Sequence, residues 1–528
     1  MRSSLIKPLF LPCIALVLGM CAPAASASTL PQGVSSVWRL RFAEKPDALG
    51  PRIQVTGIVE KQHFSPSSIM AASTDKDVPL AMPMGSPLLG DLAYRTFGLE
   101  ERVELTPSPD QTLAVSCRAG KSVAGVVFHS NTERLPTGAR GELNIQAYGD
   151  AGFQWGIARP GQDAALLQPV SALDGKQLKA SIPLEQIAAL GDGPASFVLM
   201  CPLHEAQLMI QSIALAPVPV VGSGLRAAWN WNAERWHNDS KTLIKQALEL
   251  DLQRLYIAVD MDAIGKQVKD AALLADFITH ASSAGIDVWA VEGDPAMATP
   301  QGREHALQRL KAIQAYQASA PQVARLGGVQ YDIEPYLLPA YQKSPQKVAQ
   351  QWSQTIVALS QQSQLKLDMV LPFWLPLSPF KDSVMAALQD SDSSITIMAY
   401  RVEPQAIQRV AEPLLSWGVK HAKSVHVGLE AGPLKDELTQ FYVEAPRADP
   451  ALLWLMPAQE GGEAILLSEP AHLSQGKGYN PSGQQLSSAS VVSFNGDYQS
   501  MLGTAGRLQP VFAAWSSYAG MVFHGLLK

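Results

Sequence analysis

The chain has 528 residues, of which 47% are hydrophobic and 17% are charged, and its formal net charge is −6. These values are typical of a folded globular protein with two or three domains. A chain without a basic surplus gives no reason to expect a nucleic-acid partner.

The first 27 residues have the features of a secretory signal peptide. Arg2 and Lys7 supply positive charge, the apolar segment PLFLPCIALVLGMCAP follows, and ASA at 25–27 supplies small residues for cleavage. The apolar segment is too short and too broken by proline for a membrane helix of about 20 residues, and no later segment is long enough. We therefore expect cleavage near Ala27, a secreted or periplasmic protein, and no membrane span.

Residues 28–217 are expected to form an all-β domain. Short alternating or apolar runs such as QTLAVSC, SVAGVVFH, GELNIQAYG and LMIQSIALAPV are separated by Gly, Pro, Asp and Ser. This pattern predicts a β-sandwich or jelly roll, and a carbohydrate-binding domain is one interpretation of it. The Pro- and Gly-rich residues 218–224 are the predicted linker to the next domain.

Two cysteines, Cys117 and Cys201, follow the predicted signal peptide. In an exported chain, such a pair indicates a disulfide rather than a metal site, which usually needs three or four ligands at short spacings. A pair of free, buried thiols is the alternative.

Residues 225–528 alternate apolar runs with amphipathic segments. Eight of the runs favour strands, and apolar residues recur every three or four positions in the segments between them. This alternation predicts a (β/α)8 TIM barrel, so we expect an α/β chain in which an all-β domain precedes the barrel. The expected strands are 225–231, 255–260, 287–293, 327–334, 365–373, 394–400, 424–431 and 520–525.

Active sites of such barrels lie at the C-terminal ends of the strands. Acidic and aromatic residues gather at these ends, and this mixture suits a carbohydrate, because aromatic rings cover sugar faces while carboxyl groups bind hydroxyls and perform acid/base chemistry. We therefore predict a polysaccharide substrate. The predicted substrate-binding residues are Trp229, Trp231, Asp260, Glu292, Tyr336, Trp374, Arg401 and His524.

No cofactor or metal is expected. An oxygen-ligand metal site at Asp260, Asp262, Glu292 and Asp294 is an alternative, but no spaced His or Cys set supports zinc and no loop has calcium-hand spacing. No phosphate-binding glycine loop stands before a helix, so the sequence gives no sign of a nucleotide cofactor. The sequence does not indicate an oligomeric state.

The segment GGVQYDIEPY, residues 327–336, carries the strongest catalytic signal. Strand side chains two positions apart point the same way, so Asp332 and Glu334 are expected to face one side together. Like charges at short range raise the pKa of one carboxyl group, which suits Glu334 as a general acid. Pro335 is expected to end the strand. The alternative is a structural acid pair neutralised by a barrel arginine such as Arg226 or Arg401.

YDIE at the fourth predicted strand and MAY at the sixth resemble motifs of the family 18 glycoside hydrolases, the chitinase and endo-N-acetylglucosaminidase group. The resemblance covers residues 225–528 and implies a retaining, substrate-assisted mechanism. It implies that Glu334 is the general acid/base, that Asp332 orients the substrate's 2-acetamido group, and that Tyr400 hydrogen-bonds that group. The residues that differ from those usual in the family are Gly327, Gln330, Arg401 and His524.

Two alternatives stand beside this interpretation. In another clan of retaining barrels, an acid/base glutamate on the fourth strand acts with a nucleophilic glutamate on the seventh, and Glu334 and Glu430 hold those places. The two carboxyl groups of such enzymes stand about 5 Å apart. The other alternative is a catalytically inactive barrel that only binds sugars. The catalytic candidates are thus Glu334, Asp332, Tyr400 and Glu430.

Overall fold

The structure is a computed structural model, and it describes residues 37–527 with short gaps. The gaps are residues 43–45, 47–48, 61–62, 72–79, 131–132, 160–162, 175, 191–195, 263, 339, 342–343, 448 and 460. The predicted signal peptide lies outside the described residues. In the part of the chain that is described, no helix is both long enough and apolar enough to cross a membrane.

Eight parallel strands close into a barrel, which confirms the predicted barrel. Apolar side chains such as Ala227, Tyr256, Val291 and Val522 fill its interior. The strands read as nearly continuous apolar runs because a parallel sheet covered by helices is buried on both faces. In chain order they are β17 (Leu225–Asn230), β18 (Arg254–Ala258), β19 (Asp287–Glu292), β20 (Val329–Tyr331), β21 (Leu367–Pro372), β22 (Ser393–Met398), β23 (Val425–Glu430) and β28 (Tyr518–His524).

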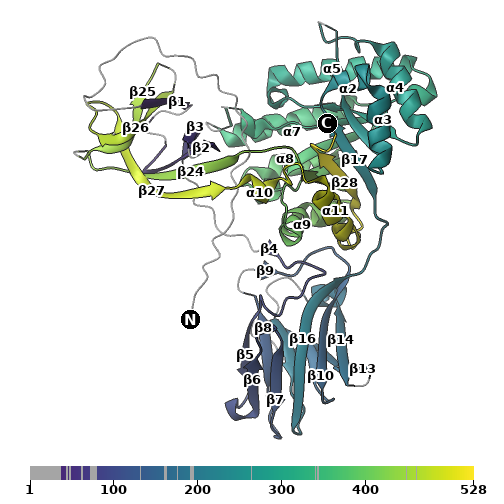
Figure 1. Ribbon diagram of the computed structural model, residues 1–528, viewed down its shortest axis with the longest axis vertical. Coiled ribbons are helices and arrows are strands. Elements are labelled where there is room, and N and C mark those ends of the chain that lie inside the picture. Colours follow the sequence, from purple (N-terminus) through teal and green to yellow (C-terminus); the bar gives the residue numbers. More distant parts are fainter. Residues whose placement is uncertain are drawn as a thin grey trace.

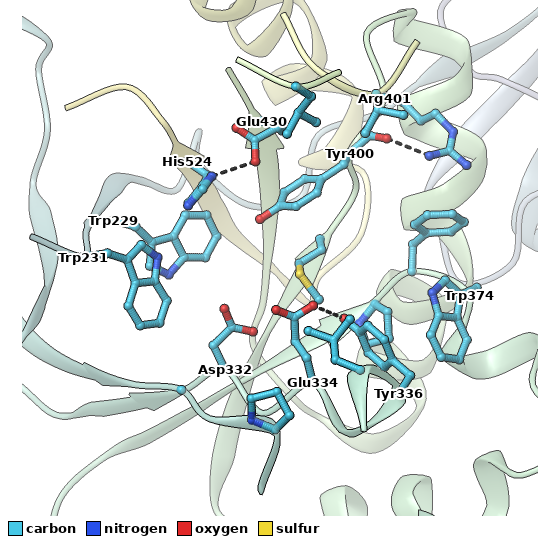
Figure 2. Close-up of a pocket in the computed structure, with 18 residues that line it drawn as sticks. Trp229, Trp231, Asp332, Glu334, Tyr336, Trp374, Tyr400, Arg401, Glu430 and His524 are labelled. Atoms are coloured by element: carbon cyan, nitrogen blue, oxygen red, sulfur yellow. Dashed lines mark hydrogen bonds and ion pairs between the residues drawn. The ribbon is translucent and has the colours of Figure 1, made fainter. Parts of the chain in front are cut away.

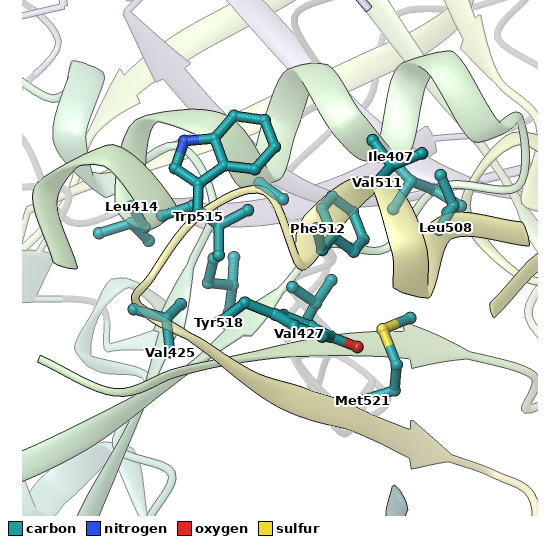
Figure 3. Packing of buried hydrophobic residues seen from close by; sticks show 14 of the residues in the cluster. Ile407, Leu414, Val425, Val427, Leu508, Val511, Phe512, Trp515, Tyr518 and Met521 are labelled. Atoms are coloured by element: carbon teal, nitrogen blue, oxygen red, sulfur yellow. The ribbon is translucent and has the colours of Figure 1, made fainter. Parts of the chain in front are cut away.

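Helices cover the outside of this barrel (Figure 1). The packing of α9 on β23 and of α11 on β28 is typical: Leu414 and Phe512 lie over Val425, Val427 and Met521 in one buried cluster (Figure 3). Apolar residues spaced three and four apart give each helix such a face. The helices of this part are α2 (Ala233–Asn238), α3 (Ser240–Glu249), α4 (Ala271–Ser283), α5 (Pro300–Ser319), α7 (Pro345–Gln362), α8 (Lys381–Asp390), α9 (Pro404–His421), α10 (Ala489–Val492) and α11 (Tyr498–Phe512).

A seven-stranded antiparallel sheet lies beside the barrel and joins two distant parts of the chain (Figure 1). The strands at 37–42 and 52–60, which were expected in the N-terminal β domain, pair instead with strands inserted between β23 and β28, and the strand at 63–71 pairs with the one at 52–60. The sheet order is β1-β26-β25-β27-β24-β2-β3. The strands are β1 (Val37–Phe42), β2 (Arg52–Glu60), β3 (His63–Ala71), β24 (Asp436–Glu444), β25 (Ala451–Pro457), β26 (Gly462–Ala471) and β27 (Lys477–Ser487).

The remaining β domain spans residues 80–217 and contains antiparallel sheets of six and five strands. Buried residues of both sheets belong to one core, and Cys117 and Cys201 form the predicted disulfide. The domain also contains the short helix α1 (Leu184–Ala189). Its strands are β4 (Leu80–Ala81), β5 (Ala93–Phe97), β6 (Val103–Pro107), β7 (Leu113–Cys117), β8 (Gly125–His129), β9 (Glu133–Arg134), β10 (Gly141–Gly149), β11 (Gln154–Ala158), β12 (Ala165–Pro169), β13 (Ser171–Asp174), β14 (Gln177–Pro183), β15 (Ser196–Met200) and β16 (Ala206–Pro217).

This β domain is fixed to the barrel through α9 and through the chain before β28. Glu412 of α9 is 2% exposed, and its Oε1 accepts a hydrogen bond from Arg134 of the β domain at 3.0 Å. The predicted linker 218–224 joins β16 to β17, and the amide of Val220 donates to the carbonyl of Ala513 at 2.8 Å. The connection is therefore packed against the barrel.

Glu412→Ala should lower the free energy of unfolding by about 2–3 kcal/mol, because Arg134 and the amide of Thr137 lose a buried acceptor. Glu249→Ala is the matched control, since this glutamate is 62% exposed beside Lys245. An exposed pair contributes little, so the control should cost less than about 0.5 kcal/mol. Denaturant unfolding compares the two variants, and equal losses would contradict the stabilising role of Glu412.

Candidate active site

A cavity of about 390 Å³ opens at the C-terminal ends of the barrel strands (Figure 2). Its size falls in the range of small-ligand sites. The predicted residues that line it are Trp229, Trp231, Asp332, Glu334, Tyr336, Trp374, Tyr400, Arg401, Glu430 and His524. The other lining residues are mostly apolar, namely Gly293, Pro295, Leu337, Pro372, Phe373, Met398, Leu434 and Val492.

Two predicted substrate-binding residues, Asp260 and Glu292, do not line this cavity. Side chains alternate along β19, and Trp289 points into the barrel core, so Glu292 points outward. There Glu292 forms a double hydrogen bond with Arg309, at 2.5 and 2.9 Å. Asp260 lies 3.9 Å from His237 instead. Within the described ranges, no group of three or more His, Cys, Asp or Glu side chains is arranged to hold a metal.

Asp332 and Glu334 follow β20 and do not lie within it, because the strand ends at Tyr331. The alternation of side chains nevertheless continues, since Ile333 is buried in the core while both carboxyl groups line the cavity. Pro335 was predicted to end the strand, and it is the first residue of the short 3-10 helix η5 (Pro335–Leu337). The local sequence thus places two carboxyl groups in the cavity at the C-terminal end of the barrel.

Burial raises the pKa of both carboxyl groups. For Asp332, burial and then the charge of Glu334 raise the pKa to about 8, against an opposite effect of His524. Burial also raises the pKa of Glu334, while the hydrogen bond that it accepts from the Tyr336 hydroxyl and the charge of His524 oppose this shift. Two acids in this setting hold a proton at a pH at which exposed acids have lost theirs.

A polar network crosses the barrel beneath the two acids. Gln330 is fully buried, accepts a hydrogen bond from Trp229 Nε1 at 2.5 Å and donates to Asp368 at 2.7 Å. Burial acts to raise the pKa of Asp368, but interactions led by those with His426 outweigh it and bring the pKa to about 2. Asp332 Oδ1, above this network, accepts no hydrogen bond from the residues described.

Sequence reasoning missed Asp368, although a lone acid in the apolar run LKLDMVLPF was a visible signal. The side chain is fully buried and lies below the cavity, where it accepts from Thr396 at 2.6 Å and Ser394 at 2.5 Å. An acid so placed does not touch a substrate in the cavity. It orients the amide of Gln330, and through it the indole of Trp229.

Glu430 and His524 form a second polar pair in the cavity. Glu430 is 4% exposed, and its Oε2 lies 2.6 Å from His524 Nδ1, while the amide of Gly432 donates to its Oε1. Burial acts to lower the pKa of His524. The hydrogen bond and charge of Glu430, together with the charges of Asp332 and Glu334, outweigh burial and raise this pKa. Glu430 therefore favours the protonated form of His524 near the two acids.

The Glu430→Gln variant should lower the pKa of His524, because the ring loses the negative charge that stabilises its protonated form. Titration of the histidine ring signals by nuclear magnetic resonance measures this change. The exposed His280 on α4 serves as the internal control, and its ring signals should be the same in both proteins. An unchanged His524 titration would show that Glu430 does not set its charge.

Aromatic rings form the walls of the cavity (Figure 2). His524 and Trp229 meet on one side with ring centroids 5.8 Å apart, and Tyr336 and Trp374 meet edge to face on the other at 5.1 Å. Trp231 is 38% exposed and also lines an adjoining cavity of about 230 Å³ that the sequence did not predict. The polar residues of that second cavity are Asn230, Asn232, Arg235 and His524.

No family model and no curated protein matches the chain. Solved structures that match include a chitinase from Chromobacterium violaceum, with 12% identity over 57% of this chain and 93% of that chain and a TM-score of 0.31. A GH18 chitinase from Cycas revoluta in complex with (GlcNAc)3 matches with 13% identity over 57% and 94% of the two chains and a TM-score of 0.30. The CBM22-1–GH10 modules of a Clostridium thermocellum xylanase match with 10% identity over 68% and 83% and a TM-score of 0.23. The three solved structures named here are glycoside hydrolases.

Proposed function

We propose that the protein is an exported glycoside hydrolase that cleaves a polysaccharide containing N-acetylhexosamine with retention of configuration. The observation that carries this proposal is the shared cavity of Asp332, Glu334 and Tyr400 within aromatic walls. The carboxyl groups are close enough for Glu334 to raise the pKa of Asp332, and both acids act on the pKa of Tyr400. Export and a carbohydrate-binding jelly roll remain expectations from the sequence.

Glu334 is the general acid of the first step. Its Oε2 accepts a hydrogen bond from the Tyr336 hydroxyl, which leaves Oε1 to carry the proton. Burial favours the protonated form. Glu334 gives this proton to the glycosidic oxygen as the bond between that oxygen and the anomeric carbon breaks, so the departing chain leaves as a neutral alcohol.

The acetamido oxygen of the substrate attacks the anomeric carbon and closes an oxazolinium ring. Asp332 accepts the acetamido N–H, which its Oδ1 is suited to do because that oxygen lacks a partner among the described residues. Burial, followed by the charges of Glu430, Asp332 and Glu334, keeps the Tyr400 phenol protonated, so it donates to the acetamido group. Glu334 then takes a proton from water, which opens the ring from the opposite face and restores the starting configuration.

The test is the release of reducing ends from N-acetylhexosamine polymers by the purified protein. Nuclear magnetic resonance of the first product should show the anomer of the substrate. A polymer with the acetamido groups replaced by hydroxyls should be inert, since it cannot form the ring. Inversion of configuration, or equal cleavage of the hydroxyl polymer, would contradict the substrate-assisted mechanism.

A direct nucleophile is the second candidate, because Glu430 lines the same cavity as Glu334. Both oxygens of Glu430 already accept hydrogen bonds, from His524 and from Gly432. These bonds hold the carboxylate as a charge partner of His524, which favours the substrate-assisted mechanism over direct attack by Glu430.

A further inference from the structure

Arg401 is a buried cation in the wall of the cavity. It is 5% exposed, and its guanidinium carbon lies 4.4 Å from the ring centroid of Phe373. Its Nη1 donates to the backbone carbonyl of Tyr400 at 2.7 Å. Among the residues that the structure describes, Arg401 has no carboxylate partner. Burial alone lowers its pKa, from 12.5 to about 10. The side chain therefore stays positively charged at neutral pH.

Two other arginines among the described residues have more extensive polar contacts than Arg401. Arg309 is held by two bonds to the carboxylate of Glu292. Arg102, which is as buried as Arg401, donates to three backbone carbonyls. Arg401 has a single carbonyl for its five N–H groups. Burying a charge is unfavourable unless the charge is paired and hydrogen-bonded. A bound anion would therefore stabilise Arg401 in this position.

The acids of the cavity do not fill this role. Glu334 accepts from Tyr336, and Glu430 is held by His524 and Gly432. Neither these two acids nor Asp332 contributes to the pKa of Arg401, which only burial shifts. Arg401 lies on the side of the cavity where Trp374 forms the wall (Figure 2). A sugar that stacks on that wall would bring its substituents toward the guanidinium.

We propose that Arg401 binds an oxyanion on the sugar that neighbours the N-acetylhexosamine, so that the substrate is an acidic polysaccharide. The preference in cleavage rests on the proposed function, whereas the binding of the oxyanion by Arg401 does not. The oxyanion is the carboxylate of a uronic acid or a sulfate ester, and both accept paired N–H bonds from a planar guanidinium. The aromatic walls bind the sugar faces, and Arg401 selects the charged neighbour.

Three polymers test the assignment: one alternates N-acetylhexosamine with a uronic acid, one is the same polymer with its carboxyl groups reduced to alcohols, and one is a sulfated N-acetylhexosamine chain. We expect kcat/KM of the natural protein to be at least about tenfold higher on one acidic polymer than on the reduced polymer. The acidic polymer with the higher kcat/KM shows whether Arg401 prefers a carboxylate or a sulfate. Equal kcat/KM on all three would overturn the assignment.

Arg401→Gln should reduce the preference for the acidic polymer at least about tenfold. Arg401→Lys keeps the positive charge but loses the paired N–H groups of the guanidinium, so it should reduce the preference less. Arg303→Gln is the matched control, because it removes the same charge from α5, away from the cavity, and should keep the preference. A preference that survives Arg401→Gln would overturn the assignment. If that variant does not fold, Arg401→Lys and the comparison of polymers with the natural protein decide the matter.

A binding measurement separates this inference from the proposed function. Calorimetry with the Glu334→Gln variant should show at least about tenfold tighter binding of the acidic polymer than of the reduced one, whether or not any polymer is cleaved. Absence of cleavage by the natural protein would contradict the hydrolase. Equal binding of the acidic and reduced polymers would contradict the role of Arg401.

Discussion

Glu334→Gln is expected to lower kcat on an N-acetylhexosamine polymer by about 10²–10⁴-fold, the range supplied by a positioned general acid. Glutamine has no proton to transfer to the glycosidic oxygen. Its amide oxygen can still accept the hydrogen bond from the Tyr336 hydroxyl, so the local packing should persist. KM should therefore change far less than kcat, and reducing-end assays at several substrate concentrations separate the two constants.

Glu304→Gln provides the matched control, because Glu304 is exposed on α5 and does not line the cavity. This variant should keep the kcat and KM of the natural protein. Full activity of Glu334→Gln would remove the acid assignment under both enzymatic mechanisms. If the natural protein binds amino-sugar and neutral polymers without releasing reducing ends, the barrel is a sugar-binding module.

The barrel and most of the cavity could be predicted because their signals are local. A parallel strand buried on both faces is a short apolar run, and a helix between two such runs has an amphipathic period. Since parallel strands all present their C-terminal ends at one rim, residues such as Asp332, Tyr400 and His524 could be placed together without knowing any contact between them.

The direction of each side chain could not be predicted as well as its place along the chain. Glu292 and Asp332 both stand near the end of a barrel strand, but Glu292 points to Arg309 and Asp332 points into the cavity. A shift of one residue in a strand exchanges its two faces. The sequence run around Glu292 is apolar on both faces, so it does not reveal which face is inside.

The seven-stranded sheet could not be predicted because its pairing depends on contacts between remote segments. Alternating apolar residues in β2 would suit any half-buried sheet, and Ile53 and Val55 share a buried cluster with Leu453 and Leu455, about 400 residues away. The surroundings of Arg401 could not be predicted either. Its position after a strand indicated substrate binding, but only the structure shows that it lacks a carboxylate partner among the described residues.

Asp332→Asn is expected to lower kcat by about 10²-fold or more, because a neutral amide can accept the acetamido N–H but cannot become the anion that stabilises the positively charged oxazolinium ring. The same change should stabilise the fold at higher pH. The pKa of Asp332 is about 8 in the folded protein against an ordinary value of 3.8. Between these values the folded state binds an extra proton, so this acid lowers stability progressively as the pH rises.

Asparagine cannot ionise, so the melting temperature of Asp332→Asn should exceed that of the natural protein by more at about pH 8 than at about pH 5. The gain in unfolding free energy of Asp332→Asn over the natural protein should be at least about 1 kcal/mol larger at about pH 8 than at about pH 5. Melting curves at both values of pH measure it. A constant difference between the two proteins would show that Asp332 does not carry the raised pKa.

Glu430→Gln completes the comparison with Asp332→Asn. If Glu430 supports the charge of His524, its replacement should cost less activity than that of Asp332, because the acetamido group still supplies the nucleophile. If Glu430 is itself the nucleophile, Glu430→Gln should lose as much activity as Glu334→Gln. Azide should then restore turnover and give a product of inverted configuration, since a small anion would take the place of the missing carboxylate. The ranking of these two variants therefore decides which carboxylate, Asp332 or Glu430, acts with Glu334.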